Sequence, residues 1–275
     1  MPYLLREGND SVDIYFEDYG SGQPVILIHG WPLSHKMWEY QVPALIGAGF
    51  RVVAYDRRGF GESGEPWTGY DYDTMADDLQ ALLETQDLTD AVLVGFSMGG
   101  GEVARYLGKH GSERIAKAML VSAVTPYMLK TEDNPEGVEQ SVFDEMKKGV
   151  KSDRIKFLAD FGKQFVNADK DPDAVSDDAL HYNKMIAAFA SPKATLDCID
   201  AFAATDFRSD LESIDVPVLL IHGDADQIVP LEVSAKRAHD IISESRLEVI
   251  EGAPHGLNYT HTEELNKLML GFLKE

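Results

Sequence analysis

The sequence predicts an α/β fold in which helices wrap a mostly parallel central sheet and a helical segment is inserted between two of its strands. Three observations support this prediction. Short apolar segments alternate with longer amphipathic ones along the 275-residue chain, without an internal repeat. Residues 125–205 interrupt this alternation with helical patterns alone. A glycine-rich turn at residues 95–101 joins one apolar segment directly to a helical pattern.

The expected strands are of two kinds. Residues 11–20 alternate apolar and polar side chains, as an antiparallel strand with one exposed face does. Six later segments are apolar almost throughout, which is typical of strands that are buried on both faces. They cover residues 24–30, 51–56, 91–96, 116–124, 216–223 and 246–252.

Helical periodicity separates most of these strands, which favours parallel pairing. The expected helices cover residues 36–48, 74–86, 98–109, 232–243 and 262–273. Thr260 followed by Glu263 matches a capping box, so we expect the last helix to begin with Thr260 as its N-cap.

Residues 125–205 contain several helical patterns but no convincing strand, with turn signals at Asn134-Pro135 and Asp171-Pro172. Helices inserted between two strands are expected above the carboxyl ends of a parallel sheet, where such folds bind ligands. We therefore expect residues 125–205 to form a helical cap over a binding crevice. Residues 1–124 and 206–275 then form the core domain.

The composition limits the partners and the compartment. The net charge of −22 would repel nucleic acids and anionic membranes, so neither is expected as a partner. Cys198 is the only cysteine, which is typical of a reducing compartment. The opening segment MPYLLREGNDSVDIYFED lacks the apolar stretch of a signal peptide, and no run approaches the length of a membrane span. We therefore expect a cytoplasmic protein.

The glycine-rich turn contains the candidate nucleophile. Gly95-Phe96-Ser97-Met98-Gly99 fits the pattern G-x-S-x-G at the junction between an expected strand and an expected helix. A serine in that position sits on a sharp turn, where side chains two residues before and after it would clash. The motif therefore predicts Ser97 as a nucleophile, and we expect Gly100 and Gly101 to let the following helix pack closely on its neighbours.

A serine hydroxyl needs a base to remove its proton and a third group to hold that base. In folds with this turn, an acid and then a histidine follow the serine along the chain. Asp224 and Asp226 follow the strand at 216–223, and His255 lies in the next strand-to-helix loop. We assign Asp226 as the acid because it lies further into the loop, and we expect Asp224 to support the turn.

The tetrahedral intermediate of acyl transfer needs hydrogen-bond donors for its oxyanion. The backbone N–H of Met98, directly after the nucleophile, is the expected first donor. The second donor should come from the loop after the strand at 24–30, where Trp31 stands in place.

Neither a metal nor an organic cofactor is expected. Residues 59–64 match G-x-G-x-x-G, but Pro66 and Trp67 follow where a dinucleotide site needs a helix to begin. No histidine spacing resembles a zinc site. We expect His222 in the core, whereas His35 and His110 lie in segments that show no companion groups for chemistry.

Six segments together resemble the cofactor-free (non-haem) haloperoxidases and aryl esterases of the α/β-hydrolase superfamily. They are HGWPLS, YDRRGFGES, LVGFSMGGGEVARY, AVTP, HGDADQIVP and APHG. The resemblance implies a triad of Ser97, Asp226 and His255, an oxyanion hole from Trp31 and Met98, and a helical cap. It also implies hydrolysis of small carboxylic esters without a cofactor, and peracid formation when hydrogen peroxide replaces water. Members of this branch are commonly homo-oligomers, so we expect the same here.

The resemblance also implies a substrate pocket beside Trp31. Its expected lining residues are Pro32, Val124, Met128, Met146, Phe161, Phe165, Ile228 and Val229. Phe157, Phe161 and Phe165 recur every four residues and form one stripe of a helix, which could equally be cap core. An apolar wall favours a small aromatic or short-chain ester.

Pro32 raises a separate hypothesis. Proline lacks an N–H and restricts the residue before it, so Pro32 should fix the peptide at Trp31. The Trp31 carbonyl, if held beside the acyl-enzyme, could accept the second proton of hydrogen peroxide. The alternative is that Pro32 only makes the loop rigid.

Other functions remain open. A lactonase or a carbon–carbon bond hydrolase would use the same triad with different cap contacts. A receptor with this fold would bind a small ligand without turning it over. A haloalkane dehalogenase is disfavoured, because its chemistry needs a carboxylate where Ser97 stands.

Overall fold

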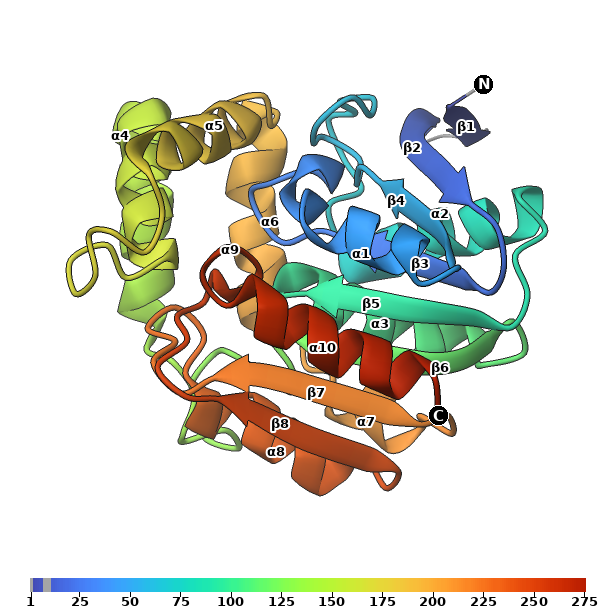
Figure 1. Cartoon of the computed structure of the whole chain (residues 1–275). Helices are drawn as coiled ribbons and strands as arrows, with labels where there is room; N and C mark the ends of the chain where they lie inside the picture. The colour runs from blue at the N-terminus through green and yellow to red at the C-terminus, as the bar shows by residue number, and fades with distance from the viewer. Residues whose placement is uncertain (1, 7–10) are drawn as a thin grey trace.

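The computed structural model describes residues 2–6 and 11–275, and within these residues it contains one eight-stranded sheet with helices on both faces (Figure 1). The strands are β1 (Tyr3–Arg6), β2 (Val12–Gly20), β3 (Pro24–Ile28), β4 (Arg51–Tyr55), β5 (Ala91–Phe96), β6 (Ile115–Val121), β7 (Val218–Gly223) and β8 (Ser245–Ile250). Their order in the sheet is β1-β2-β4-β3-β5-β6-β7-β8, and β3 to β8 pair in parallel. The α/β prediction is confirmed.

The strand predictions hold except at the edges of the sheet. β2 pairs antiparallel with both β1 and β4, as its alternating pattern indicates. Every residue of β5 and of β7 is buried. The prediction that residues 246–252 form a strand buried on both faces is wrong: β8 is an edge strand, and Ile250 is its only buried residue.

The core helices are α1 (Gln41–Gly47), α2 (Tyr72–Thr85), α3 (Met98–His110), α7 (Arg208–Glu212), α8 (Ala235–Ile241), α9 (Leu257–Thr260) and α10 (Thr262–Leu273). Two 3-10 turns, η1 (His35–Trp38) and η2 (Leu231–Val233), precede α1 and α8. In Figure 1, α1 and α10 cover the near face of the sheet, and α2, α3 and α8 lie behind it. The expected helix at 36–48 is therefore divided into η1 and α1.

The capping-box prediction is wrong. Residues 257–260 form the short helix α9, so Thr260 ends one helix instead of capping the next. His261 is the N-cap of α10, and its side chain makes no capping hydrogen bond.

The helices α4 (Gln140–Phe165), α5 (Asp177–Ala188) and α6 (Pro192–Ala204) lie together beyond one end of the sheet (Figure 1). The arrowheads of β5, β7 and β8 point toward them, so they stand at the carboxyl ends of the parallel strands.

Helix α4 is kinked at Asp153, whose φ of −154° and ψ of 89° are not helical. Asp153 Oδ1 accepts a hydrogen bond from the Lys156 N–H at 3.0 Å and so caps the second half of the helix. A Cβ atom at Gly149 would lie 2.5 Å from Cδ2 of Phe157, so only glycine lets the two halves close against each other. Phe143 from the first half and Phe161 from the second half line one apolar cavity beside Ser97.

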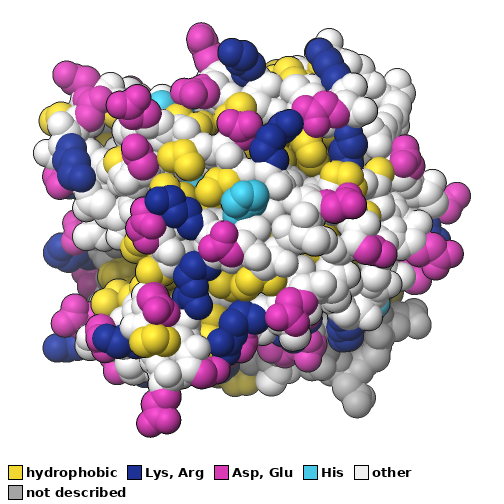
Figure 2. All heavy atoms as spheres, turned by 90° about the horizontal axis from the view of Figure 1, so that it is seen from below, with side chains coloured by type: hydrophobic (Ala, Val, Ile, Leu, Met, Phe, Trp, Pro, Cys, Tyr) yellow, Lys and Arg dark blue, Asp and Glu magenta, His cyan; other side chains and the backbone are white. Residues whose placement is uncertain are grey.

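Figure 2 shows acidic side chains spread among basic and apolar ones over the face that it draws. Among residues 2–6 and 11–275, no helix combines the length and hydropathy that a bilayer crossing requires.

Candidate active site

Ser97 stands at the sharp turn between β5 and α3. Its φ of 53° and ψ of −116° lie in a region that non-glycine residues rarely adopt, and such strain is typical of functional sites. A Cβ atom at Gly95 would lie 2.3 Å from the Gly99 carbonyl oxygen. One at Gly99 would lie 2.4 Å from the Ile28 carbonyl oxygen. The turn can therefore form only with glycine on both sides of the serine.

The expectation for Gly100 and Gly101 is confirmed. A Cβ atom at Gly100 would lie 2.4 Å from the Cβ atom of Ala123, and one at Gly101 would lie 2.7 Å from Cζ of Phe207. Because Gly100 and Gly101 have no side chains, α3 can pack closely against the segment after β6 and against the start of α7.

Three segments bring Ser97, His255 and Asp226 together. His255 Nε2 lies 3.0 Å from Ser97 Oγ, and His255 Nδ1 lies 2.7 Å from Asp226 Oδ2. The three residues are 6%, 1% and 7% exposed. Because the carboxylate can only accept, Nδ1 carries the proton and Nε2 is free to accept the serine proton. Asp224 is exposed instead, and its Oδ1 accepts from the Gly252 N–H at 2.6 Å.

The environment of Asp226 keeps its carboxyl ionised. Burial raises the pKa of this carboxyl, but the electrostatic interaction with His255 and hydrogen bonds from His222 and His255 outweigh burial. Backbone N–H groups of Ile228 and Val229 donate to Oδ1 at 2.9 and 2.8 Å. The pKa of Asp226 is therefore held well below its usual range, which suits a group that stabilises an imidazolium.

Two expectations about other histidines are wrong. His35 Nδ1 lies 2.8 Å from Asp56 Oδ1, and His110 Nε2 lies 2.9 Å from Asp77 Oδ1, so both histidines have companion carboxylates. These partners come from other segments of the chain, and local sequence does not reveal them. His222 is fully buried, as predicted, but it also contacts Asp226.

The expected oxyanion donors belong to the start of α3 and to the loop after β3. Among the described residues, the backbone N–H groups of Trp31 and Met98 have no hydrogen-bond acceptor. Met98 is the first residue of α3, where a helix leaves its N–H groups free. The Trp31 indole is fixed by a 3.0 Å hydrogen bond from Nε1 to the Thr195 carbonyl.

A buried ion pair ties the loop before Trp31 to the nucleophile helix. Arg57 Nε donates to Glu102 Oε2 at 2.7 Å, and Arg57 Nη2 donates to the His29 carbonyl at 2.9 Å. His29 Nε2 accepts from the Arg57 N–H at 3.0 Å. Burial, with the charge of Arg57, lowers the pKa of His29 to about 3, so the ring stays an acceptor. Sequence analysis did not find this network.

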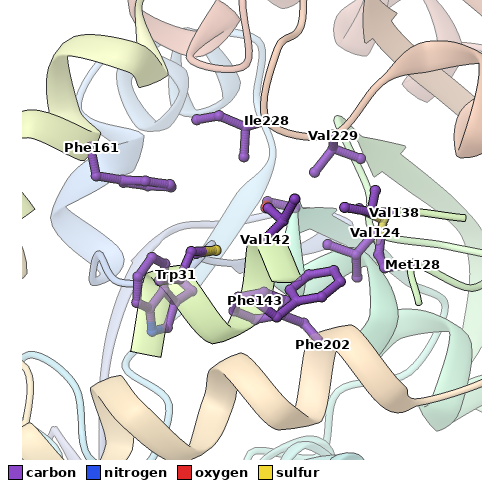
Figure 3. A pocket seen from close by; sticks show the side chains of 12 residues that line it. Trp31, Val124, Met128, Val138, Val142, Phe143, Phe161, Phe202, Ile228 and Val229 are labelled. Carbon is purple, nitrogen blue, oxygen red and sulfur yellow. The ribbon is translucent and has the colours of Figure 1, made fainter. Parts of the chain in front are cut away.

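Ser97 opens on a cavity of about 50 Å³. The cavity is lined by Trp31, Ser97, Val124, Met128, Val138, Val142, Phe143, Met146, Phe161, Phe202, Ile228 and Val229. Figure 3 shows these side chains converging from the cap helices and from loops at the end of the sheet. No charged side chain is among them, so the lining suits an uncharged apolar group.

Six of the eight expected pocket residues line this cavity. Pro32 and Phe165 do not; they line a neighbouring cavity of about 20 Å³ that shares Phe161 with the first. Phe165 instead packs edge-on against the His255 ring, with centroids 5.2 Å apart. The sequence-based list also missed Val138 from the loop before α4, Val142 and Phe143 from the first half of α4, and Phe202 from α6.

Within the described part of the chain, no group of three or more histidine, cysteine, aspartate or glutamate side chains is placed to hold a metal ion.

Comparisons with known proteins agree with this fold. The sequence profile of the alpha/beta hydrolase fold matches residues 23–262. A non-heme chloroperoxidase of Kitasatospora aureofaciens is 43% identical over 97% of this chain and 98% of its own length. A bifunctional esterase/perhydrolase of Acinetobacter calcoaceticus is 41% identical over the whole of both chains. The crystal structure of a bromoperoxidase from Bacillus anthracis is 54% identical, covers 97% of each chain and superposes with a TM-score of 0.95. The chain therefore belongs to the alpha/beta hydrolase fold family.

Proposed function

We propose that the protein is a serine hydrolase that cleaves small carboxylic esters through an acyl-enzyme and forms peracids when hydrogen peroxide replaces water. One observation carries the proposal: the hydrogen-bonded chain from Ser97 through His255 to Asp226 opens on a cavity without charged side chains. The names of the chloroperoxidase and esterase/perhydrolase relatives support it.

The geometry allows each step of acyl transfer. Ser97 Oγ attacks the ester carbonyl while His255 Nε2 takes its proton, and Asp226 stabilises the imidazolium. The N–H groups of Trp31 and Met98 donate to the oxyanion. The C–O bond then breaks, and His255 returns the proton to the leaving alcohol. Water or hydrogen peroxide attacks the acyl-serine next and loses a proton to His255. The bond between the acyl carbon and Ser97 Oγ then breaks, His255 returns the proton to Oγ, and a carboxylic acid or a peracid is released.

We assign residues 125–205 to the cap and residues 1–124 and 206–275 to the core domain. The cap helices α4 and α6 supply Phe143, Phe161 and Phe202 to the cavity wall. An apolar cover of this kind excludes bulk water from the acyl-enzyme. We further propose that identical chains associate, which sedimentation in solution tests, and that the protein is cytoplasmic.

Incubation with p-nitrophenyl acetate tests the proposal. We expect release of p-nitrophenolate and an acetyl adduct on Ser97 that mass spectrometry detects. A receptor that only binds the ester would release no more p-nitrophenolate than the Ser97→Ala variant does.

The size of the cavity predicts a preference for short acyl chains. Phe143→Ala should enlarge the cavity and raise the butanoate-to-acetate ratio of kcat/KM by on the order of 10-fold, because each buried methylene contributes about 0.8 kcal/mol. Ile155→Ala is the matched control: this exposed side chain lies on the same helix but lines neither cavity, so the ratio should stay within about twofold. A ratio that Phe143→Ala leaves unchanged would place the acyl group elsewhere.

The Pro32 hypothesis predicts a change in the choice of nucleophile. Pro32→Leu should lower the ratio of perhydrolysis to hydrolysis several-fold, because one hydrogen bond contributes about 0.5–1.5 kcal/mol. Bromide-dependent dye halogenation and acid release from one acyl donor measure the two rates. If both rates move together, Pro32 only makes the loop rigid.

A further inference from the structure

His222 connects the sheet to the loop that holds the triad acid. It is the penultimate residue of β7 and is fully buried. Its Nε2 lies 2.8 Å from the Val229 carbonyl oxygen and 3.2 Å from Asp226 Oδ2. A carbonyl and an ionised carboxylate can only accept, so Nε2 carries a proton and donates to both. Nδ1 is buried, and none of the described residues is its partner.

The loop reached by His222 has two tasks in the proposed mechanism. Asp226 holds His255 through Oδ2, whereas Ile228 and Val229 form part of the cavity wall. The N–H groups of Ile228 and Val229 also donate to Asp226 Oδ1. The Asp226 carboxylate and the cavity-wall residues Ile228 and Val229 therefore form one hydrogen-bonded unit. His222 donates to both parts of it, to the carboxylate and to the Val229 carbonyl.

Strand β7 gives this unit a rigid support. It lies between β6 and β8, and all of its residues are buried. Without the His222 N–H, Asp226 Oδ2 would keep its bond to His255 alone, and the Val229 carbonyl would lose its side-chain donor. Carboxylate and wall would then be free to shift together.

We propose that His222 is a positioning residue that fixes the triad acid and the acyl-cavity wall in one arrangement. It touches neither the substrate nor Ser97, and its effect passes through Asp226 and Val229. The inference rests on the proposed esterase function, because both parts of the loop act on the same acyl-enzyme.

Two substitutions separate positioning from folding. His222→Leu removes the donor and keeps an apolar side chain of moderate size. His222→Gln can place an amide N–H near the position of Nε2. His110→Leu is the matched control, because it removes another histidine–aspartate contact, which lies at the end of α3 away from Ser97.

For each variant, kcat and KM are measured with p-nitrophenyl acetate and butanoate, and the rate at which a fluorophosphonate probe labels Ser97 is measured separately. His222→Leu should lower kcat and the labelling rate by on the order of 10–100-fold, as misplacement of a catalytic group does. It should also lower the acetate-to-butanoate ratio of kcat/KM several-fold. His222→Gln should bring kcat, the labelling rate and the acetate-to-butanoate ratio back to within a few-fold of the wild-type values. His110→Leu should match the wild type in all three.

The acetate-to-butanoate ratio does not depend on the fraction of enzyme that is folded. A His222→Leu variant that loses activity with an unchanged ratio would overturn the inference, and so would one that labels at the wild-type rate. If the wild type labels but turns over no ester, the proposed function fails. In that case, slower labelling of His222→Leu with recovery in His222→Gln would still support the positioning role.

Discussion

Replacing Ser97 with alanine should lower kcat for p-nitrophenyl acetate by a factor on the order of 10⁶, because the reaction then has no covalent route. The cavity and the two N–H groups at Trp31 and Met98 would remain, so the residual rate should exceed that of the reaction in water by on the order of 10³-fold. The measurement is turnover at saturating ester, together with mass spectrometry for an acetyl adduct. The variant should carry no adduct.

Two controls separate lost chemistry from lost structure. Ser213→Ala removes a serine that donates to the Asp210 carbonyl and should turn over ester at the wild-type rate. Ser97→Gly also lacks the nucleophile but can adopt a φ of 53° without strain, so it should unfold at a higher temperature than Ser97→Ala. Turnover by Ser97→Ala close to that of the wild type would exclude the acyl-enzyme.

The sequence predicts the positions of Ser97, Asp226 and His255 because each follows a strand of a parallel sheet. The carboxyl ends of β5, β7 and β8 meet at one edge, so residues far apart in the chain converge there. The glycines around Ser97 add a local steric signal, which the close approaches at Gly95 and Gly99 explain. The turn chemistry around Ser97 and the order of strands and loops along the chain are the signals on which the prediction of these three residues depends.

The cavity wall was harder to predict, because it depends on the path of a kinked helix. The kink at Asp153 turns Phe143 and Phe161 toward one space and leaves Phe165 against His255. Helical periodicity places Phe157, Phe161 and Phe165 on one stripe, but it does not show what each ring meets.

The buried hydrogen-bond network of Arg57, Glu102 and His29 could not be predicted from the sequence either. Arg57 and Glu102 are 45 residues apart, and their contact depends on how α3 packs against the loop after β4. The pairing of His35 with Asp56 likewise joins η1 to the loop after β4. A single sequence carries no local signal for such contacts, because both partners look like ordinary surface residues until the sheet is formed.

Asp226→Asn should lower kcat by on the order of 10⁴-fold, because it reverses the tautomer of His255. An asparagine Oδ1 could still accept from the Ile228 and Val229 N–H groups, which leaves the amide NH₂ facing His255 Nδ1. A donor in that position requires Nδ1 to accept, so the ring proton moves to Nε2. Nε2 then cannot take the proton of Ser97 Oγ.

Asp224→Asn is the matched comparison, since it makes the same chemical change two residues away. Asp224 Oδ1 accepts from the Gly252 N–H, and an asparagine oxygen can do the same, so kcat should stay within a few-fold of the wild type. Steady-state kinetics of both variants with one ester give the comparison directly. Equal losses, or a larger loss in Asp224→Asn, would show that Asp226 is not the acid. A large loss in Asp226→Asn alone would mean that the carboxylate at 2.7 Å from His255 Nδ1 sets the tautomer on which the serine depends.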